Sequence, residues 1–173
     1  KTTSPGLNLK VPFGIDKVIK VPVQRQLKQE FGFRTRVPGQ QTVYQKQGYD
    51  DESLMLTGDK NVIDVEWIVQ YKVRDPADFL FKIINVPQAV RDITETAIRR
   101  TVGNMKFDQV LGNREVLAAT TAKELQSALD RYESGVKIVT VQLQDVNPPE
   151  QVKPAFNEVN EARQERERMI NEA

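Results

Sequence analysis

Apolar and polar residues alternate most regularly in residues 62–73, VIDVEWIVQYKV. This period of two predicts a strand with one buried face. That face consists of Ile63, Val65, Trp67, Val69, Tyr71 and Val73. The polar segment 57–61 ahead of the strand is typical of a turn, so we expect residues 53–56 to pair with it as a hairpin. The dipeptide Asp75-Pro76 should end it.

Two other segments also carry a strand pattern. Residues 5–23 alternate in two successive sets, so we expect two short strands there. Pro12 and Pro22 would confine these strands to an edge or a bulge, because proline cannot donate to a ladder. Residues 136–146 predict a further strand, and its apolar set changes phase after Ile138, which indicates a bulge or burial on both faces.

Two helices are predicted between the later strands. The first starts near Pro87, which suits a first helical turn, and ends at Gly103. The second starts at Asn113, an N-cap candidate, and ends at Gly135. The buried stripes are expected at Val90, Ile93, Ala97 and Thr101 in the first helix, and at Leu117, Thr121, Leu125, Ala128 and Tyr132 in the second.

The segment LQDVNPPEQVKPAF changes from a strand pattern to a helix pattern at two prolines. Asn147 fits a helix N-cap with Glu150 as its capping-box partner. Pro154 then predicts either a kink or a helix start near Lys153. The helix beyond is too charged to be stable alone, so it should pack on its own domain or, as we favour, join an intermolecular helix array. The assembly candidates are Phe156, Val159, Ala162, Arg163, Arg166 and Met169.

The order of elements predicts an α+β fold. We expect a β-rich subdomain over residues 1–75, an α/β subdomain over residues 76–147, and the start of an assembly helix over residues 148–173. The chain begins with Lys1 rather than Met and ends inside a helical pattern, so we expect it to be a fragment of a longer protein. No window of 18 apolar residues predicts a membrane span.

Charge is divided unevenly along the chain. Residues 1–49 hold nine basic and two acidic residues, whereas the whole chain has a net charge of only +1. Residues 24–58, which overlap the end of this basic part, follow no clear period and are expected to form a long excursion or extended hairpin. The basic and aromatic side chains of the N-terminal third could contact an anionic membrane surface or single-stranded nucleic acid. Alternatively, they could form a solvated strand face with the phenylalanines in the core. The surface candidates are Lys10, Phe13, Lys17, Lys20, Arg25, Lys28, Phe31, Phe33, Arg34 and Arg36.

The composition argues against catalysis. The chain contains no histidine and no cysteine, which removes thiolate nucleophiles, imidazole bases and Cys/His metal sites. The serines, Ser4, Ser53, Ser127 and Ser134, lie in no nucleophile motif, although a serine-type hydrolase with a Ser/Lys pair stays an alternative. The acidic triplet at residues 50–52 matches no calcium loop, and no glycine-rich phosphate loop occurs. We therefore expect no enzyme activity, cofactor or metal.

Four segments together carry a family resemblance: PGLNLKVPF, VIDVEWIVQYKVRDP, AVRDITETAIRRTVGNMKFDQVL and the exit VKIVTVQLQDVNPPEQVKPAFNEVNEARQERERMINEA. Their order and spacing resemble the SPFH (stomatin–prohibitin–flotillin–HflK/C) domain family over nearly the whole chain. Within that family MLTGDKNVIDVEWIVQYKV, EFGFRT and NPPEQVKPAF are most similar to the HflK-like branch.

The resemblance implies a non-enzymatic scaffold in the bacterial inner membrane. A single-pass anchor would precede PGL, and this domain would lie on the periplasmic side. The domain and its following helix would assemble with HflC-like subunits and with further copies of the chain, and the assembly would modulate the membrane AAA protease FtsH. The resemblance implies no catalytic residues and no nucleic-acid partner.

Overall fold

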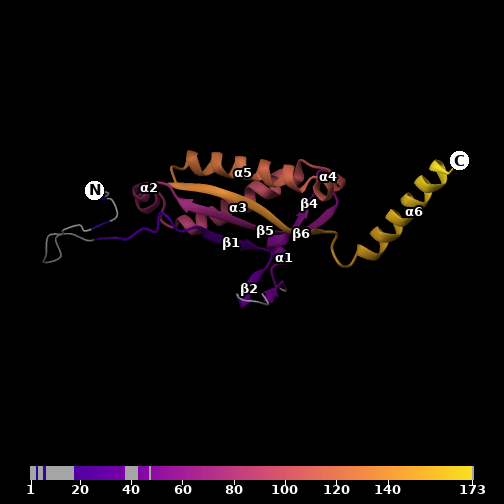
Figure 1. Ribbon diagram of the computed structural model, residues 1–173, viewed down its shortest axis with the longest axis horizontal. Helices are drawn as coiled ribbons and strands as arrows, with labels where there is room; N and C mark the ends of the chain where they lie inside the picture. Colours follow the sequence, from indigo (N-terminus) through magenta and orange to yellow (C-terminus); the bar gives the residue numbers. More distant parts are fainter. Residues whose placement is uncertain (1–2, 4–5, 7–17, 38–42, 47, 173) are drawn as a thin grey trace.

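A computed structural model describes residues 3, 6, 18–37, 43–46 and 48–172 (Figure 1). The strands among these residues are β1 (Leu27–Phe31), β2 (Arg34–Val37), β3 (Val43–Gln45), β4 (Leu54–Leu56), β5 (Val62–Val73) and β6 (Val136–Asn147). The helices are α1 (Asp50–Ser53), α2 (Pro76–Phe81), α3 (Val86–Gly103), α4 (Phe107–Gly112), α5 (Arg114–Arg131) and α6 (Lys153–Asn171). This combination of a sheet with helices confirms the predicted α+β class.

Strand β5 lies inside an antiparallel sheet that has four strands among the described residues. It pairs with β6 along one edge, and with β1 and β4 along the other. The pairing of β4 with β5 confirms the predicted hairpin around residues 57–61. The register with β6 skips Val139 between Ile138 and Thr140, so the change of phase in the sequence marks a bulge. The expected boundary near Asp75 falls between β5 and α2, and the sheet draws strands from both sides of it.

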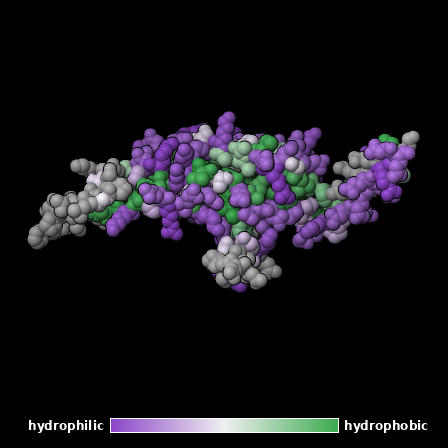
Figure 2. All heavy atoms as spheres, in the orientation of Figure 1, coloured by the Kyte–Doolittle hydropathy of each residue, from purple (hydrophilic) through white to green (hydrophobic). Residues whose placement is uncertain are grey.

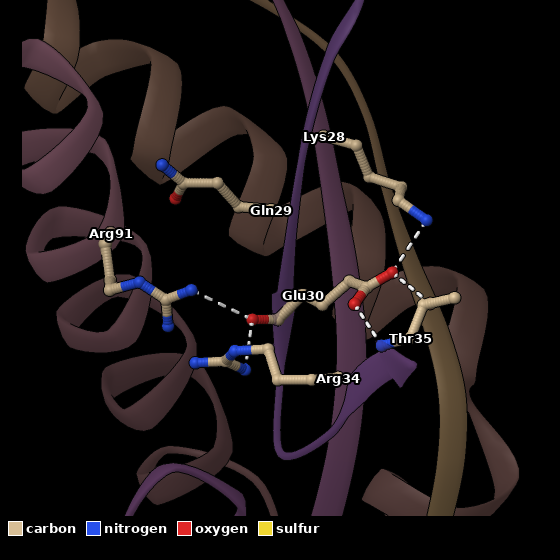
Figure 3. Close-up of a pocket in the computed structure, with 6 residues that line it drawn as sticks. All are labelled: Lys28, Gln29, Glu30, Arg34, Thr35 and Arg91. Atoms are coloured by element: carbon tan, nitrogen blue, oxygen red, sulfur yellow. Dashed lines mark hydrogen bonds and ion pairs between the residues drawn. The ribbon is translucent and has the colours of Figure 1, made fainter. Parts of the chain in front are cut away.

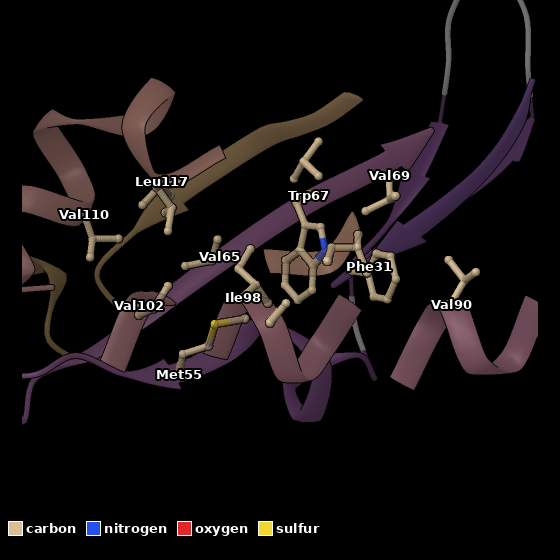
Figure 4. Packing of buried hydrophobic residues seen from close by; sticks show 14 of the residues in the cluster. Phe31, Met55, Val65, Trp67, Val69, Val90, Ile98, Val102, Val110 and Leu117 are labelled. Carbon is tan, nitrogen blue, oxygen red and sulfur yellow. The ribbon is translucent and has the colours of Figure 1, made fainter. Parts of the chain in front are cut away.

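Helices α3 and α5 lie against the same face of the sheet and cover its core (Figure 1). The predicted inner face of β5 is buried at every position. At its centre the rings of Phe31 and Trp67 stack in parallel, with centroids 4.8 Å apart (Figure 4). Helix α3 covers this pair: Val90 and Ile98 belong to the same buried cluster, and the guanidinium of Arg91 lies 4.6 Å from the centre of the Phe31 ring. The core therefore forms between the sheet and the helices α3, α4 and α5.

The helical stripes agree with prediction at most positions. Leu117, Thr121 and Leu125 are buried as expected, but Tyr132 is 60% exposed and Leu129 is buried instead. The difference arises because α5 ends at Arg131, so Tyr132 no longer follows the helical spacing. The short helices α2 and α4 were not predicted, because six residues span fewer than two turns and show no readable period.

The N-terminal prediction is wrong where the structure describes it. Residues 18–26 contain no strand, and Ile19 is exposed rather than packed. Pro22 lies in this segment and has no N–H to donate to a ladder. The earlier strand of the predicted pair, and most of residues 5–17, lie outside the described residues. The predicted irregularity of residues 24–58 is also wrong at β1, which pairs with β5 in the central sheet.

The chain leaves the sheet through the double proline. Asn147 is the last residue of β6 and its side-chain amide donates to Asp145, so the predicted N-cap at Asn147 is wrong. Helix α6 begins at Lys153 and holds Pro154 in its first turn, where no N–H bond is required. The alternative of a late helix start is therefore confirmed. From there α6 extends away from the sheet and helices (Figure 1).

The Phe31–Trp67 stack provides a test of this core. Replacing Phe31 by Ala should lower the free energy of unfolding by about 3–5 kcal/mol, because it leaves a cavity beneath Trp67. The matched control is Phe81→Ala, which removes the same ring from a side chain that is 78% exposed and should change the value by less than about 0.5 kcal/mol. Urea denaturation followed by tryptophan fluorescence measures both, and equal effects would contradict the assigned core.

Candidate interaction surfaces

The β2–β3 hairpin projects from the sheet on the side away from α5 (Figure 1). Arg34, the first residue of β2, joins it to the body. Its guanidinium donates to both carboxylate oxygens of Glu52 on α1, at 2.7 and 3.0 Å. Arg91 on α3 donates to the same carboxylate at 3.2 Å. One acidic side chain thus links the hairpin, α1 and α3 through a bidentate pair, a geometry that restricts rotation of the arginine.

Gly32 makes this junction possible. Its φ is +79°, and a Cβ at this position would lie 2.9 Å from Cβ of Ser53. Its backbone N–H also donates to Glu52 at 3.1 Å. A side chain at residue 32 would therefore clash with α1 and strain the backbone.

A shallow cavity of about 410 Å³ lies beside this junction (Figure 3). Its charged groups satisfy one another, whereas the amide Oε1 of Gln29, which also lines the cavity, is buried without a hydrogen-bond partner among the described residues. The Glu30 carboxylate accepts from the backbone and hydroxyl of Thr35 and pairs with Lys28 at 2.6 Å, while its carbonyl accepts from Arg34 and Arg91. Burial would raise the pKa of Glu30, but the bonds from Lys28 and Thr35 lower it below its ordinary value. The cavity therefore has the chemistry of a structural joint, with no unpartnered base.

A second junction fixes the other end of the hairpin. Lys46, directly after β3, contacts Glu66 at 2.8 Å and Asp145 at 3.2 Å. Glu66 and Asp145 are opposite residues of β5 and β6, and Glu66 is 7% exposed. Burial raises the pKa of Glu66, and the charges of Asp145 and Asp64 raise it further, although Lys46 lowers it in part. Lys46 therefore holds together two carboxylates that would otherwise repel each other.

The predicted surface candidates separate into three groups. Phe31 is 0% and Phe33 2% exposed, so neither can contact lipid, and their assignment to a surface is wrong because they fill the core. Arg34 is half-buried in its bond to Glu52. The exposed candidates are Lys20, Arg25, Lys28 and Arg36, whereas Lys10, Phe13 and Lys17 lie outside the described residues. Burial of the two phenylalanines also removes them as stacking platforms for nucleic-acid bases.

Helix α6 contacts the body mainly near its start. Phe156 packs edge-on against Phe107 of α4, with centroids 5.1 Å apart. Val159, Ala162, Arg166 and Met169 are exposed, and the side chain of Arg163 lies outside the described part of the chain. Hydrophilic surface dominates the helix (Figure 2). Beyond Phe156, the large apolar side chains of α6 are therefore left exposed within the described part of the chain.

Other polar candidates are taken up by the fold. Ser53 and Ser134 are buried, and Ser127 is exposed on α5, while Ser4 lies outside the described residues. Residues 50–52 form α1, and among the described residues no group of three or more acidic side chains could hold a metal ion. No helix within the described ranges has the length and apolarity needed to cross a bilayer.

Sequence reasoning missed the residues that join these elements. Arg91 and Glu52 are 39 positions apart, and no local pattern links them. Glu66 lies between the predicted buried positions of β5, so the alternation places it on the other face, and the pattern carries no sign that Lys46 covers it. A pairing of β5 with β6 in register would have placed Glu66 opposite Asp145, which is the one signal available.

The sequence of this chain is similar to those of known proteins. The SPFH domain / Band 7 family matches residues 1–173. Protein HflK of Treponema pallidum is 39% identical over 99% of this chain and 53% of its own length, and Protein HflK of Borreliella burgdorferi is 33% identical over 99% and 55%. The Modulator of FtsH protease HflK of Escherichia coli is 35% identical over 69% of this chain and 29% of its own length. The chain spans about half, or less, of the length of these relatives. It belongs to the SPFH/Band 7 family.

The junction at Glu52 predicts a loss of stability on substitution. Glu52→Gln should lower the free energy of unfolding at pH 7 by about 1.5–3 kcal/mol, since it removes the charge that satisfies two partly buried arginines. Burial would raise the pKa of Glu52, but Arg34 and Gly32 lower it. The contribution is therefore present above the ordinary pKa of 4.5 and is lost as the pH falls through the lower folded value. Urea denaturation at several pH values tests this, with the exposed Asp51→Asn as the matched control.

Glu66 should behave in the opposite way. Because its pKa is raised, the folded chain binds this proton more tightly than the unfolded chain, and stability rises as the pH falls through the raised value. Glu66→Gln should therefore have a free energy of unfolding at pH 7 that is at least as high as that of the parent. Any gain should vanish below pH 4.5, where residue 66 of the parent is protonated in both the folded and the unfolded chain. A clear loss of stability at pH 7 would contradict the raised pKa.

Proposed function

We propose that this chain is the SPFH domain of an HflK-like scaffold that modulates a membrane AAA protease of the FtsH type. The observation that carries the proposal is its similarity, across most of the chain, to proteins named HflK, one of which is named a modulator of FtsH protease. In this proposal the scaffold is non-enzymatic and binds HflC-like subunits as well as further copies of itself. It controls which substrates reach the protease.

The charged junctions support a structural role. Glu52 and Glu30 are engaged by arginine, lysine and threonine, and Lys46 binds two carboxylates. Groups with such fixed partners hold elements in place and have little freedom to transfer protons to a substrate. Both ends of the β2–β3 hairpin are held in this way, which makes it a rigid arm suited to contact a neighbouring subunit.

The remaining exposed basic residues support an anionic membrane surface as a partner. Lys20, Arg25 and Arg36 are exposed within the N-terminal third, as is Lys28, whose ammonium already pairs with Glu30. Each basic side chain near an anionic bilayer contributes about 1 kcal/mol. The proposal places this domain beside the bacterial inner membrane, on its periplasmic face, with a single-pass anchor outside the chain described here.

Co-purification from membranes tests the function. The full-length protein, affinity-tagged and extracted in mild detergent, should bring down an FtsH-type protease and an HflC-like subunit. The double variant Val159→Asp/Ile170→Asp should reduce their recovery several-fold, because it charges the exposed apolar side of α6. Gln164→Asp, which adds a charge on a different side of the same helix, is the control and should leave recovery unchanged. A parent protein that is monomeric and brings down neither partner would refute the proposal.

A further inference from the structure

Helices α3 and α5 form a groove on the solvent side of the helical layer. It has a volume of about 590 Å³, and Ala97, Ala128 and Ile93 contribute to its floor. Arg100, Lys123 and Arg131 line it, with Glu124 as the single acidic residue. Neighbouring helices leave a channel of this kind wherever small residues face outward, and a third helix can pack into it.

The cations of this groove are not neutralised. Arg100, Lys123 and Arg131 form no ion pair or side-chain hydrogen bond with any described residue. The basic groups of the two hairpin junctions, by contrast, all bind carboxylates. The groove therefore presents a net positive, partly apolar surface that an acidic helix would complement.

The chain itself carries such a helix. Glu158, Glu161 and Glu165 are spaced by three and four residues on α6, which puts them on one side of the helix. All three are exposed, and none has an ion-pair partner among the described residues. Glu158 and Glu165 lie about 10.5 Å apart along the helix axis, and Lys123 and Arg131 on α5 about 12 Å apart. The acidic and basic spacings therefore match within one residue.

We propose that α6 of one copy docks in the α3–α5 groove of a second copy, with its glutamates against the groove cations. Within a chain α6 points away from the helical layer (Figure 1), so its own groove is out of its reach. The contact is head-to-tail: each copy offers a helix and a groove, and repetition produces a ring or a filament. This inference rests on the proposed scaffold function and deepens it by naming the surface through which copies assemble.

Cross-linking tests the contact directly. The chain contains no cysteine, so single introduced cysteines report defined pairs. A mixture of two chains, Ser127→Cys in the groove and Ala162→Cys on α6, should give a cross-linked dimer with a short bis-maleimide. The control pairs Ala162→Cys with Gln142→Cys, an exposed residue of β6 on the helix-free face of the sheet, and should give no product.

Charge reversal tests the electrostatic part. Lys123→Glu/Arg131→Glu in the groove, or Glu158→Lys/Glu165→Lys on α6, should each weaken self-association about tenfold by sedimentation equilibrium. Mixing the two variants should restore association, because a helix with reversed charge then meets a groove with reversed charge. A variant that fails to fold alone could not regain binding in this way. Raising the ionic strength should weaken the parent contact.

The outcomes separate this inference from the proposed function. Cross-linking of Ala162→Cys only with itself would show helix-to-helix assembly and overturn the groove contact. A chain that stays monomeric, or a groove cysteine that cross-links to a different protein in membranes, would also overturn it. In each of these cases co-purification with the protease and the HflC-like subunit still decides the proposed function independently.

Discussion

The structure depends on the requirement that β5 be hydrogen-bonded along both edges. A buried strand of 12 residues cannot leave its backbone N–H and C=O groups without partners. Strand β6 satisfies one edge over nearly its full length, but the other edge is shared by β1, which ends opposite Trp67, and β4, which starts opposite Asp64. Between these partners lies a gap at Val65 and Glu66. The chain must turn away from the sheet there and return to it.

The charged junctions follow from that gap. Gly32 turns the chain out of β1 at a positive φ and packs close to Ser53 and Glu66, and α1 brings Glu52 to the same place. The hairpin leaves the sheet at this point, so its two ends are anchored by carboxylates that flank the gap. The two anchors differ electrostatically. Burial would raise the pKa of Glu52, but the surrounding cations and an N–H group lower it. Burial raises the pKa of Glu66, and the neighbouring carboxylates raise it further.

Local pattern predicted the parts of the fold that repeat along the chain. The inner face of β5, the bulge after Ile138 and the stripes of α3 and α5 each depend on a period that a sequence displays. The burial of Phe31 and Phe33 depends on no such period. Two aromatic residues around a glycine in a basic segment form the same sequence pattern whether they lie on the surface or in the core. Only the pairing of β1 with β5, 40 residues away, distinguishes the two. The ion-pair partners of Glu52 were beyond prediction for the same reason.

The surfaces left unsatisfied have a common explanation in assembly. A monomer gains nothing from a helix that buries little of its own surface, and an uncompensated cationic groove costs repulsion energy in isolation. Helix α6 and the groove each become favourable when a neighbouring copy supplies the other, because the acidic side of α6 then contacts the groove. The apolar side of α6 stays free to contact further helices. Such a heterologous contact can be repeated without limit or closed into a ring. A chain that assembles through these two surfaces would therefore be expected to keep both of them and to point the helix away from its own groove.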